Sequence, residues 1–257
     1  MKITFLGSGS SFISHKHNYQ NNILIEVGNK KILVDAGTTI LPALEDAGHD
    51  PKSITDIIIT HCHGDHIYGL EALGFINYFS KDGNKPFLHS STAILNEIVQ
   101  VLSPSMSTLE SGKVSMTKYF KFRPFDGLFF FYFESSLFPI IKFVPVQHVK
   151  DKESYGISIA YKNMKIFFTS DTKFHYYDQY NISDIIFQDC EFADYPNGVH
   201  AQYRLLRTLP ENIKSKMWLM HCNIPITDEL QIEATMTDGF KGVATRGQII
   251  DLKELRR

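Results

Sequence analysis

The sequence predicts an α/β fold of two mixed sheets with helices outside, and three observations support this prediction. Short apolar runs of β-strand length recur along the whole chain. Helix candidates lie between several of these runs, so that strands and helices are mixed within one chain. The 257 residues are 43% apolar, which is enough to bury a sizeable core.

Strand candidates outnumber helix candidates. In chain order, the apolar runs cover residues 2–6, 23–27, 31–34, 57–60, 87–89, 140–146, 156–160, 165–169, 185–188, 218–221 and 248–252. Helices are expected over residues 67–79, 92–102 and 201–208. Ser90 and Ser91 open the second of these helices, and Pro210 ends the third.

One domain over residues 1–257 is the simplest division of the chain, because it shows no internal repeat and no low-complexity linker. The formal charge is −2, from 26 Lys and Arg against 28 Asp and Glu, and basic residues come in pairs at most. Such a distribution gives no electrostatic footprint for a long nucleic acid. No run approaches the roughly 18 apolar residues of a membrane span, so no membrane partner is expected.

The three cysteines, Cys62, Cys190 and Cys222, are widely spaced and form no CxxC motif. They therefore indicate neither a disulfide framework nor a cysteine zinc site, and a reducing, cytoplasmic setting is expected. Residues 1–11 have too short an apolar core for a signal peptide and are expected to form a strand that enters a Gly/Ser turn. A soluble, unexported protein is the expectation that follows.

Residues 118–134 form the most unusual segment, with two aromatic runs around Asp126 and Gly127. Asp-Gly is a favoured hairpin turn, so the segment predicts a β-hairpin that buries its aromatic side chains in the core. The alternative is a surface that lines the substrate pocket or forms a dimer contact.

The strongest site signal is the stretch THCHGDH at residues 60–66. His-x-His positions on an extended chain point the same way, and the turn that follows can bring Asp65 and His66 into the same small volume. Imidazole and carboxylate suit zinc, which makes His61, His63, Asp65 and His66 candidate metal ligands. A histidine-rich surface loop is the alternative, but such a loop seldom follows a strand of buried type with an intervening glycine.

Three further candidates lie where strand candidates end: His148, Asp171 and His221. Open sheets place ligands beyond the carboxyl ends of their strands, so these side chains and the THCHGDH motif are expected to converge on one site. Taken alone, His148 could be a solvated loop histidine. The four strand ends together favour a metal centre.

These motifs, with FTSDT around Asp171 and LMHCN around His221, resemble the metallo-β-lactamase superfamily. The resemblance covers nearly the whole chain, from KITFLGSGSS through ILVDAGTT to VATRGQIIDL. It implies an αβ/βα four-layer sandwich. It also implies that one metal ion is held by His61, His63 and His148, a second by Asp65, His66 and His221, and that Asp171 bridges the two.

The pattern of ligands favours two zinc ions and hydrolysis over redox chemistry. β-Lactamases of this fold usually lack the second histidine of the Asp-His pair and use a cysteine where Asp171 stands. The diiron branch usually has a carboxylate at the position of His63. Two Zn²⁺ are therefore expected, with Mn²⁺ or another divalent ion as alternatives. Ions about 3.5–4 Å apart would provide a bridging hydroxide near neutral pH.

A further pair points to the phosphodiesterase branch. Asp189 closes a strand candidate and His200 opens a helix candidate, and they resemble the acid and extra histidine of ribonuclease Z and its small relatives. The resemblance implies that His200 protonates the leaving oxygen while Asp189 orients its imidazole. Asp65 completes the expected catalytic set. The alternative for His200 is a surface position at a helix N-terminus.

The compact length of the chain narrows the class of substrate that is expected. Bacterial ribonuclease Z generally carries a tRNA-gripping arm before the bridging aspartate, but the 22 residues 149–170 are filled by two strands joined at Lys162 and Asn163. Cyclic phosphodiesterases of phosphonate pathways carry a cysteine-rich zinc site that three scattered cysteines cannot form. The remaining resemblance is to compact cyclic nucleotide phosphodiesterases, including the phage anti-Pycsar enzymes that degrade cyclic mononucleotide immune signals.

This resemblance implies an enzyme that opens 3′,5′-cyclic mononucleotides to 5′-monophosphates, in the host cytoplasm if a phage encodes it. An RNA-processing endonuclease and a metal-binding protein without turnover stay open as alternatives. Relatives of the fold often dimerise, so a homodimer is expected. His15 and His17, in the loop after the first strand, are expected to be solvated. Cys62 and Cys222 are expected to point away from the metal ions, because neighbours on a strand face opposite sides.

Overall fold

The computed structural model of the chain describes residues 1–125, 130–131, 139–193, 198–224 and 229–254. The chain forms two compact units whose segments interleave in the sequence. Unit 1 comprises Met1–Gly7, Gln20–Gly127 and Ile249–Arg257, and unit 2 comprises Ser8–Tyr19 and Leu128–Gln248. Each unit is built around its own sheet. That residues 1–257 form a single domain stays a prediction.

The sheet of unit 1 has the strand order β16-β1-β2-β3-β4-β5-β8. Its strands are β1 Lys2–Gly7, β2 Asn22–Val27, β3 Lys30–Val34, β4 Asp56–Ile58, β5 Phe87–Ser91, β8 Lys121–Phe125 and β16 Ile249–Asp251. The strands from β16 to β3 pair antiparallel, and those from β3 to β8 pair parallel. The parallel half therefore brings the carboxyl ends of β3, β4 and β5 to one edge of the sheet.

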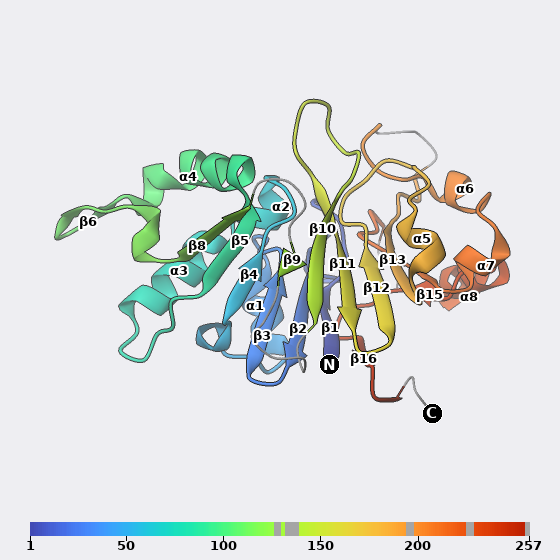
Figure 1. The fold of residues 1–257 in the computed structure, drawn as a ribbon, viewed down its shortest axis with the longest axis horizontal. Coiled ribbons are helices and arrows are strands. Elements are labelled where there is room, and N and C mark those ends of the chain that lie inside the picture. The colour runs from blue at the N-terminus through green and yellow to red at the C-terminus, as the bar shows by residue number, and fades with distance from the viewer. Residues whose placement is uncertain (126–129, 132–138, 194–197, 225–228, 255–257) are drawn as a thin grey trace. The chain divides into compact units, whose positions relative to one another are not determined.

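Unit 1 also contains helices of different lengths. They are α1 Ile40–Asp46, α2 Gly64–Ile67, α3 Leu70–Phe79 and α4 Thr92–Met106, with the 3₁₀ turns η1 Pro51–Ser53 and η2 Met116–Lys118. Strands β6 Thr108–Leu109 and β7 Gly112–Lys113 form a separate ribbon. Figure 1 shows α4 beside β5 and β8. Its N-cap is Ser91, whose hydroxyl accepts a hydrogen bond from Ile94 N–H at 3.2 Å, which confirms the predicted start.

The helix predicted over residues 67–79 is interrupted at Gly69, where α2 ends and α3 begins. Gly69 N–H donates to Ala36 O at 2.8 Å. A Cβ at position 69 would lie 2.3 Å from Gly37 O, so only glycine permits this approach. The contact fixes α2, which carries the Asp-His pair of the THCHGDH motif, against the loop after β3.

The sheet of unit 2 has the strand order β15-β14-β13-β12-β11-β10-β9. Its strands are β9 Phe130–Phe131, β10 Ile140–Pro145, β11 Tyr155–Tyr161, β12 Met164–Phe168, β13 Ile185–Asp189, β14 Met217–Met220 and β15 Gly242–Val243. Strands β9 to β12 pair antiparallel and β12 to β15 pair parallel. Both sheets thus have an antiparallel half and a parallel half, although no repeat is visible in the sequence.

The helices of unit 2 are α5 Gln179–Ile182, α6 Tyr203–Leu206, α7 Glu211–Lys214 and α8 Glu229–Thr237. α7 and α8 lie beside β14 and β15 (Figure 1). Strand residues such as Phe167 and Leu219 pack with Tyr180, Leu206 and Ile213 in one buried apolar cluster. The helix predicted over residues 201–208 is only the single turn α6. In the described part of the chain, no helix is long and apolar enough to cross a membrane.

The predicted strands are confirmed. Each of the eleven apolar runs coincides with a strand of the structure, with ends shifted by two residues at most. The strand pair predicted around Lys162 and Asn163 is also present, because Tyr161 of β11 lies opposite Met164 of β12. Lys162 reaches this tight turn with a φ of 57°.

The hairpin predicted over residues 118–134 was wrong. β8 pairs parallel with β5 in unit 1, whereas β9 pairs antiparallel with β10 in unit 2. The Asp126–Gly127 turn and most of the second aromatic run lie outside the described residues. Core burial is confirmed for the first run, where Tyr119 and Phe120 are at most 1% exposed. A local turn signal cannot show that β8 pairs with the distant strand β5, or that β9 pairs with the next strand β10 rather than with β8.

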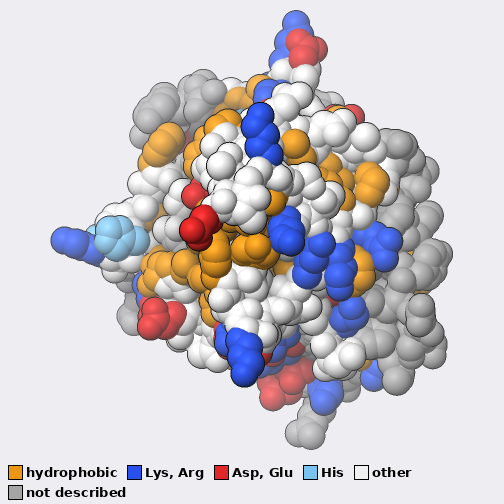
Figure 2. Space-filling model, turned by 90° about the vertical axis from the view of Figure 1, so that its left-hand side faces the viewer, with side chains coloured by type: hydrophobic (Ala, Val, Ile, Leu, Met, Phe, Trp, Pro, Cys, Tyr) orange, Lys and Arg blue, Asp and Glu red, His pale blue; other side chains and the backbone are white. Residues whose placement is uncertain are grey.

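β8 is an edge strand of unit 1 and carries side chains that oppose pairing with another chain. Lys121, Arg123 and Pro124 are exposed along it. The Lys121 ammonium and the Arg123 guanidinium lie 5.0 and 4.7 Å from the ring centroid of Phe87. Figure 2 views the side that carries α3, α4 and β6 in Figure 1, and there Lys and Arg side chains lie among apolar ones.

Asp56 and His89 form a buried polar pair between the neighbouring strands β4 and β5. His89 Nε2 lies 3.0 Å from Asp56 Oδ1, and Lys30 Nζ lies 3.1 Å from Asp56 Oδ2. Burial lowers the pKa of His89, and this outweighs the opposing effect of Asp56. Burial would raise the pKa of Asp56, but the hydrogen bond from His89 and the charge of Lys30 help to hold it below its usual range.

The lowered pKa of His89 predicts a loss of stability on acidification. Below about pH 6.5 the unfolded chain binds a proton that the folded protein does not, so the unfolding free energy falls as pH drops through the folded pKa. Gln can donate the same hydrogen bond but does not titrate. The unfolding free energy of wild type should therefore fall by up to about 1.4 kcal/mol per pH unit more than that of His89→Gln. Urea unfolding between about pH 7.5 and 5.5 measures this difference, and parallel pH profiles would contradict the assignment.

Candidate metal centre

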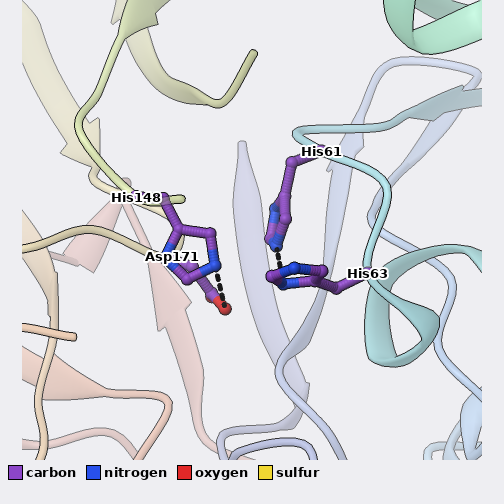
Figure 3. Close-up of side chains that lie close together, drawn as sticks. All are labelled: His61, His63, His148 and Asp171. Atoms are coloured by element: carbon purple, nitrogen blue, oxygen red, sulfur yellow. Dashed lines mark hydrogen bonds and ion pairs between the residues drawn. The ribbon is translucent and has the colours of Figure 1, made fainter. Parts of the chain in front are cut away.

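His61 and His63 lie beyond the carboxyl end of β4 in unit 1. His61 Nε2 and His63 Nδ1 are 3.1 Å apart, and the two rings meet at 79°. Figure 3 shows these nitrogens facing each other. Two nitrogen ligands of a tetrahedral zinc ion, each at about 2.0–2.1 Å, stand about 3.3–3.4 Å apart. The pair therefore has nearly the separation of two ligands of one ion.

Asp65 and His66 lie on α2, and both are buried. His66 Nε2 is 3.3 Å from Asp65 Oδ2. The other ring nitrogen, His66 Nδ1, is 2.8 Å from Asp35 Oδ2. A proton on Nδ1 that is donated to this carboxylate leaves the Nε2 lone pair directed towards Asp65, as metal-binding histidines require.

Asp35 is a site residue that the sequence analysis missed. Its carboxylate accepts a hydrogen bond from Thr60 N–H at 2.9 Å and from the Thr60 hydroxyl at 2.9 and 3.1 Å, in addition to the His66 contact. The signal that identified His148, Asp171 and His221 was also present for Asp35, which directly follows β3.

In unit 2, His148, Asp171 and His221 lie beyond the ends of β10, β12 and β14, and all three are buried. Asp171 Oδ1 is 3.4 Å from His221 Nε2, and Asp171 Oδ2 is 3.9 Å from His148 Nε2. The second of these contacts is drawn in Figure 3. One carboxylate with an imidazole beside each oxygen is the arrangement that a bridging role requires.

The two histidines of unit 2 are oriented through their other ring nitrogens. His148 Nδ1 donates to Val199 O at 2.9 Å, and His221 Nδ1 is 3.4 Å from Asp189 Oδ1. Both rings therefore present Nε2 to Asp171. In both units, imidazole and carboxylate groups make up the donor set, and this set fits a divalent ion such as zinc.

Strained backbone is concentrated at these strand ends. Asp35, Ser170 and His221 have left-handed φ values of 62°, 53° and 57°. Residues other than glycine rarely adopt this conformation, at a cost of about 1–3 kcal/mol each. His221 is a candidate ligand, Ser170 precedes the candidate Asp171, and Asp35 contacts the candidate His66. The strain therefore lies where the candidate ligands are held.

The structure brings Asp189 and His200 together within unit 2. Asp189 Oδ2 accepts hydrogen bonds from His200 Nδ1 and from Thr172 N–H, each at 2.8 Å. The His200 ring stacks on that of His221, with centroids 4.9 Å apart. Ligand atoms of Asp189, His200 and His221 lie within 4.8 Å of one another, so the geometry also permits a metal-binding role for His200.

Asp189 and His200 shift each other's pKa in the direction of an ion pair. Burial lowers the pKa of His200, but the charge of Asp189 and the hydrogen bond to it outweigh burial and raise the pKa. Burial would raise the pKa of Asp189, but His200 holds it below its usual range. The His200 side chain is 18% exposed. A protonated imidazole with partial access to solvent has the properties of a general acid.

The prediction that His15 and His17 are solvated is confirmed. His15 and His17 are exposed. Cys62 Sγ donates to Ile94 O at 3.5 Å, and Cys222 is 2% exposed within the apolar cluster of unit 2. Cys222 therefore points into the apolar interior as predicted, and the orientation of Cys62 relative to a metal ion stays a prediction.

Comparison with known proteins places the chain in a family. A family model described as "Anti-Pycsar protein Apyc1" matches residues 1–250. The chain belongs to this family. A curated anti-Pycsar protein Apyc1 from Paenibacillus harenae is 31% identical over 232 residues, covering 86% of this chain and 89% of the relative. One from Bacillus phage BSP38 is 32% identical over 240 residues, covering 86% and 88%.

A solved structure resembles the fold of this chain. The metallo-β-lactamase fold protein YhfI from Bacillus subtilis matches with a TM-score of 0.72 and 20% identity, covering 97% of this chain and 99% of that one. The predicted fold class, a metallo-β-lactamase fold with two mixed sheets and helices, is therefore confirmed.

Asp35→Asn should destabilise unit 1, because an amide NH₂ would replace one of the oxygens that accept from Thr60 and His66. Asparagine tolerates left-handed φ, so the backbone conformation is retained. We expect a loss of about 2–4 kcal/mol in the unfolding free energy, measured by urea denaturation.

Asp178→Asn is the control, because Asp178 is exposed and makes no side-chain capping hydrogen bond at the start of α5. Its effect should stay within about 0.5 kcal/mol. If Asp35→Asn unfolds at the same urea concentration as wild type, Asp35 does not organise this group.

Proposed function

We propose that this chain is a metal-dependent phosphodiesterase that hydrolyses 3′,5′-cyclic mononucleotides to 5′-monophosphates. The observation that carries the proposal is the hydrogen bond from His200 to the buried Asp189 carboxylate, with the His200 imidazole stacked on that of His221. A phosphodiester with a poor leaving group needs a proton donor, and this pair is suited to supply one. Membership of a family whose relatives are named anti-Pycsar proteins supports a cyclic nucleotide substrate.

We further propose that the candidate ligands hold two divalent ions, zinc by preference. His61, His63 and His148 would hold one ion, Asp65, His66 and His221 the other, and Asp171 both. The separations and ring orientations within each unit support this allocation.

When bound, the two ions would activate water and neutralise charge on the phosphodiester oxygens. The Nδ1–H of His200 makes a hydrogen bond to Asp189, and in the protonated imidazole Nε2 carries the second proton, which passes to the departing sugar oxygen and leaves a neutral ring. Asp189 fixes the ring and favours its protonated form. Asp65, the third residue proposed for catalysis, would act from its place among the ligands.

The biological setting is part of the same proposal. A relative encoded by a Bacillus phage carries the anti-Pycsar name. Degradation of immune signal nucleotides in the cytoplasm of a host cell is the role that follows from this name. The substrate is then a small cyclic nucleotide. The homodimer stays a prediction, because most of the aromatic run that suggested it lies outside the described residues.

A panel of cyclic mono- and dinucleotides tests the function. Purified protein should open at least one 3′,5′-cyclic mononucleotide and contain close to two zinc-like ions per chain by elemental analysis. Asp171→Ala should lose activity and part of its metal, because Asp171 lies beside both His148 and His221.

Two further substrates separate the alternatives. Cleavage of a pre-tRNA in place of cyclic nucleotides would favour an RNA-processing endonuclease. Failure to hydrolyse even bis(p-nitrophenyl) phosphate would leave a metal-binding protein without turnover. A folded and fully active Asp171→Ala protein would rule out the two-ion arrangement.

His200→Ala tests the proton donor. The variant should keep its metal and fold while turnover of a cyclic nucleotide falls by about 10²–10⁴, the usual effect of a positioned general acid. Asp189→Asn should reduce turnover less than His200→Ala, because Asp189 only orients the imidazole and favours its protonated form. The defect should shrink on a p-nitrophenyl ester, whose leaving oxygen needs no proton.

Equal losses on good and poor leaving groups would indicate a role of His200 in binding. Loss of metal from His200→Ala would indicate a ligand. Unchanged turnover of cyclic nucleotides would show that His200 has no part in the reaction.

A further inference from the structure

Thr172 makes a contact to the Asp189–His200 pair that the sequence did not indicate. Its backbone N–H donates to Asp189 Oδ2 at 2.8 Å, and the same oxygen accepts from His200 Nδ1 at 2.8 Å. Thr172 directly follows Asp171, the proposed bridging ligand. A group that holds Thr172 in place therefore also holds the acceptor of His200.

A buried tyrosine fixes the Thr172 hydroxyl. Tyr177 OH lies 2.5 Å from Thr172 Oγ1 and accepts a hydrogen bond from Gln147 N–H at 3.2 Å. Thr172 Oγ1 also lies 3.1 Å from both Gln147 O and Lys173 O, and either oxygen can accept its proton. Gln147 directly precedes His148, so the Tyr177 hydroxyl joins the residue before one proposed ligand to the residue after another.

These contacts form one consistent set of donors and acceptors. Gln147 N–H donates to Tyr177, the Tyr177 hydroxyl can donate to Thr172 Oγ1, and the Thr172 hydroxyl can then donate to Gln147 O. Burial raises the pKa of Tyr177, so the hydroxyl keeps its proton at neutral pH. Tyr177 is 6% exposed, and water has little access to replace a lost hydroxyl.

We propose that Tyr177 is a positioning residue for the reaction, because its hydroxyl locks the two ligand-bearing segments and so sets the Asp189 carboxylate that orients His200. This proposal rests on the proposed function of His200 as a proton donor. A displaced Thr172 N–H would weaken one of the two hydrogen bonds on Asp189 Oδ2. The His200 ring would then be held less firmly, although no proposed ligand is removed.

Tyr177→Phe removes the hydroxyl and keeps the ring, and Tyr176→Phe is the matched control. The Tyr176 hydroxyl donates to Asn181 Oδ1 at 2.8 Å, and both tyrosine rings pack edge-on against Tyr180. Each variant loses one hydroxyl, but only Tyr177→Phe breaks the connection to Thr172. Both variants should keep the metal content of wild type.

Kinetics of the metal-loaded enzyme give the first test. Tyr177→Phe should lower kcat on a 3′,5′-cyclic mononucleotide by about tenfold with little change in KM, because it loosens the general acid without removing it. On bis(p-nitrophenyl) phosphate the loss should stay below about twofold. Thr172→Val should match Tyr177→Phe, and the double variant should be no slower than either single variant. Tyr176→Phe should equal wild type on both substrates.

An NMR measurement makes the test independent of the substrate. With ¹⁵N-labelled histidine, the His200 Nδ1 proton is identified by its absence from His200→Ala. Its resonance should shift or broaden in Tyr177→Phe and stay unchanged in Tyr176→Phe. Wild type that leaves cyclic nucleotides intact would refute the proposed function alone. An unchanged resonance in Tyr177→Phe, or an equal loss on both substrates, would overturn the positioning role.

Discussion

A buried carboxylate is stable only when hydrogen-bond donors surround it, and in each unit one such carboxylate organises the candidate ligands. Asp35 accepts from Thr60 N–H and His66 Nδ1 in unit 1. Asp189 accepts from Thr172 N–H and His200 Nδ1 in unit 2. In both units the N–H belongs to the chain that leaves the neighbouring parallel strand. The carboxylate therefore ties two strand ends together and orients the imidazole that donates to it.

The same constraint explains why strain is tolerated at these positions. His221 has a left-handed backbone conformation, and both backbone polar groups of the next residue, Cys222, are hydrogen-bonded. Cys222 N–H donates to Ser8 O, and Cys222 O accepts from Ser10 N–H, each at 3.0 Å. The loop Ser8–Tyr19 thus belongs to unit 2 although it directly follows β1 of unit 1. Packing of Cys222 in the apolar cluster adds to this hold and keeps the His221 ring beside Asp171.

Most candidate ligands could be predicted because each follows an apolar run and belongs to a residue type that binds metal. Asp35 follows such a run too, but its partner Thr60 can be named only once β3 and β4 are known to be neighbours. The wrong hairpin has the same origin, since pairing between distant strands leaves no mark on a turn sequence. α8 was missed because it is short and largely polar, and a helix without an apolar face has no periodicity to detect.

The two neighbours of β1 lie at very different distances along the chain. β2 follows β1 closely, whereas β16 supplies Asp251 opposite Lys2, and Leu252 N–H donates to Met1 O at 3.1 Å. Contacts between such distant segments form late, because a very long loop must close first. During synthesis, β1 keeps an open edge until β16 leaves the ribosome, by which time every strand of unit 2 has emerged. The first and the last strand to be synthesised therefore both belong to unit 1. Until β16 pairs with β1, correct folding of this sheet requires that the open edge of β1 does not pair with another strand.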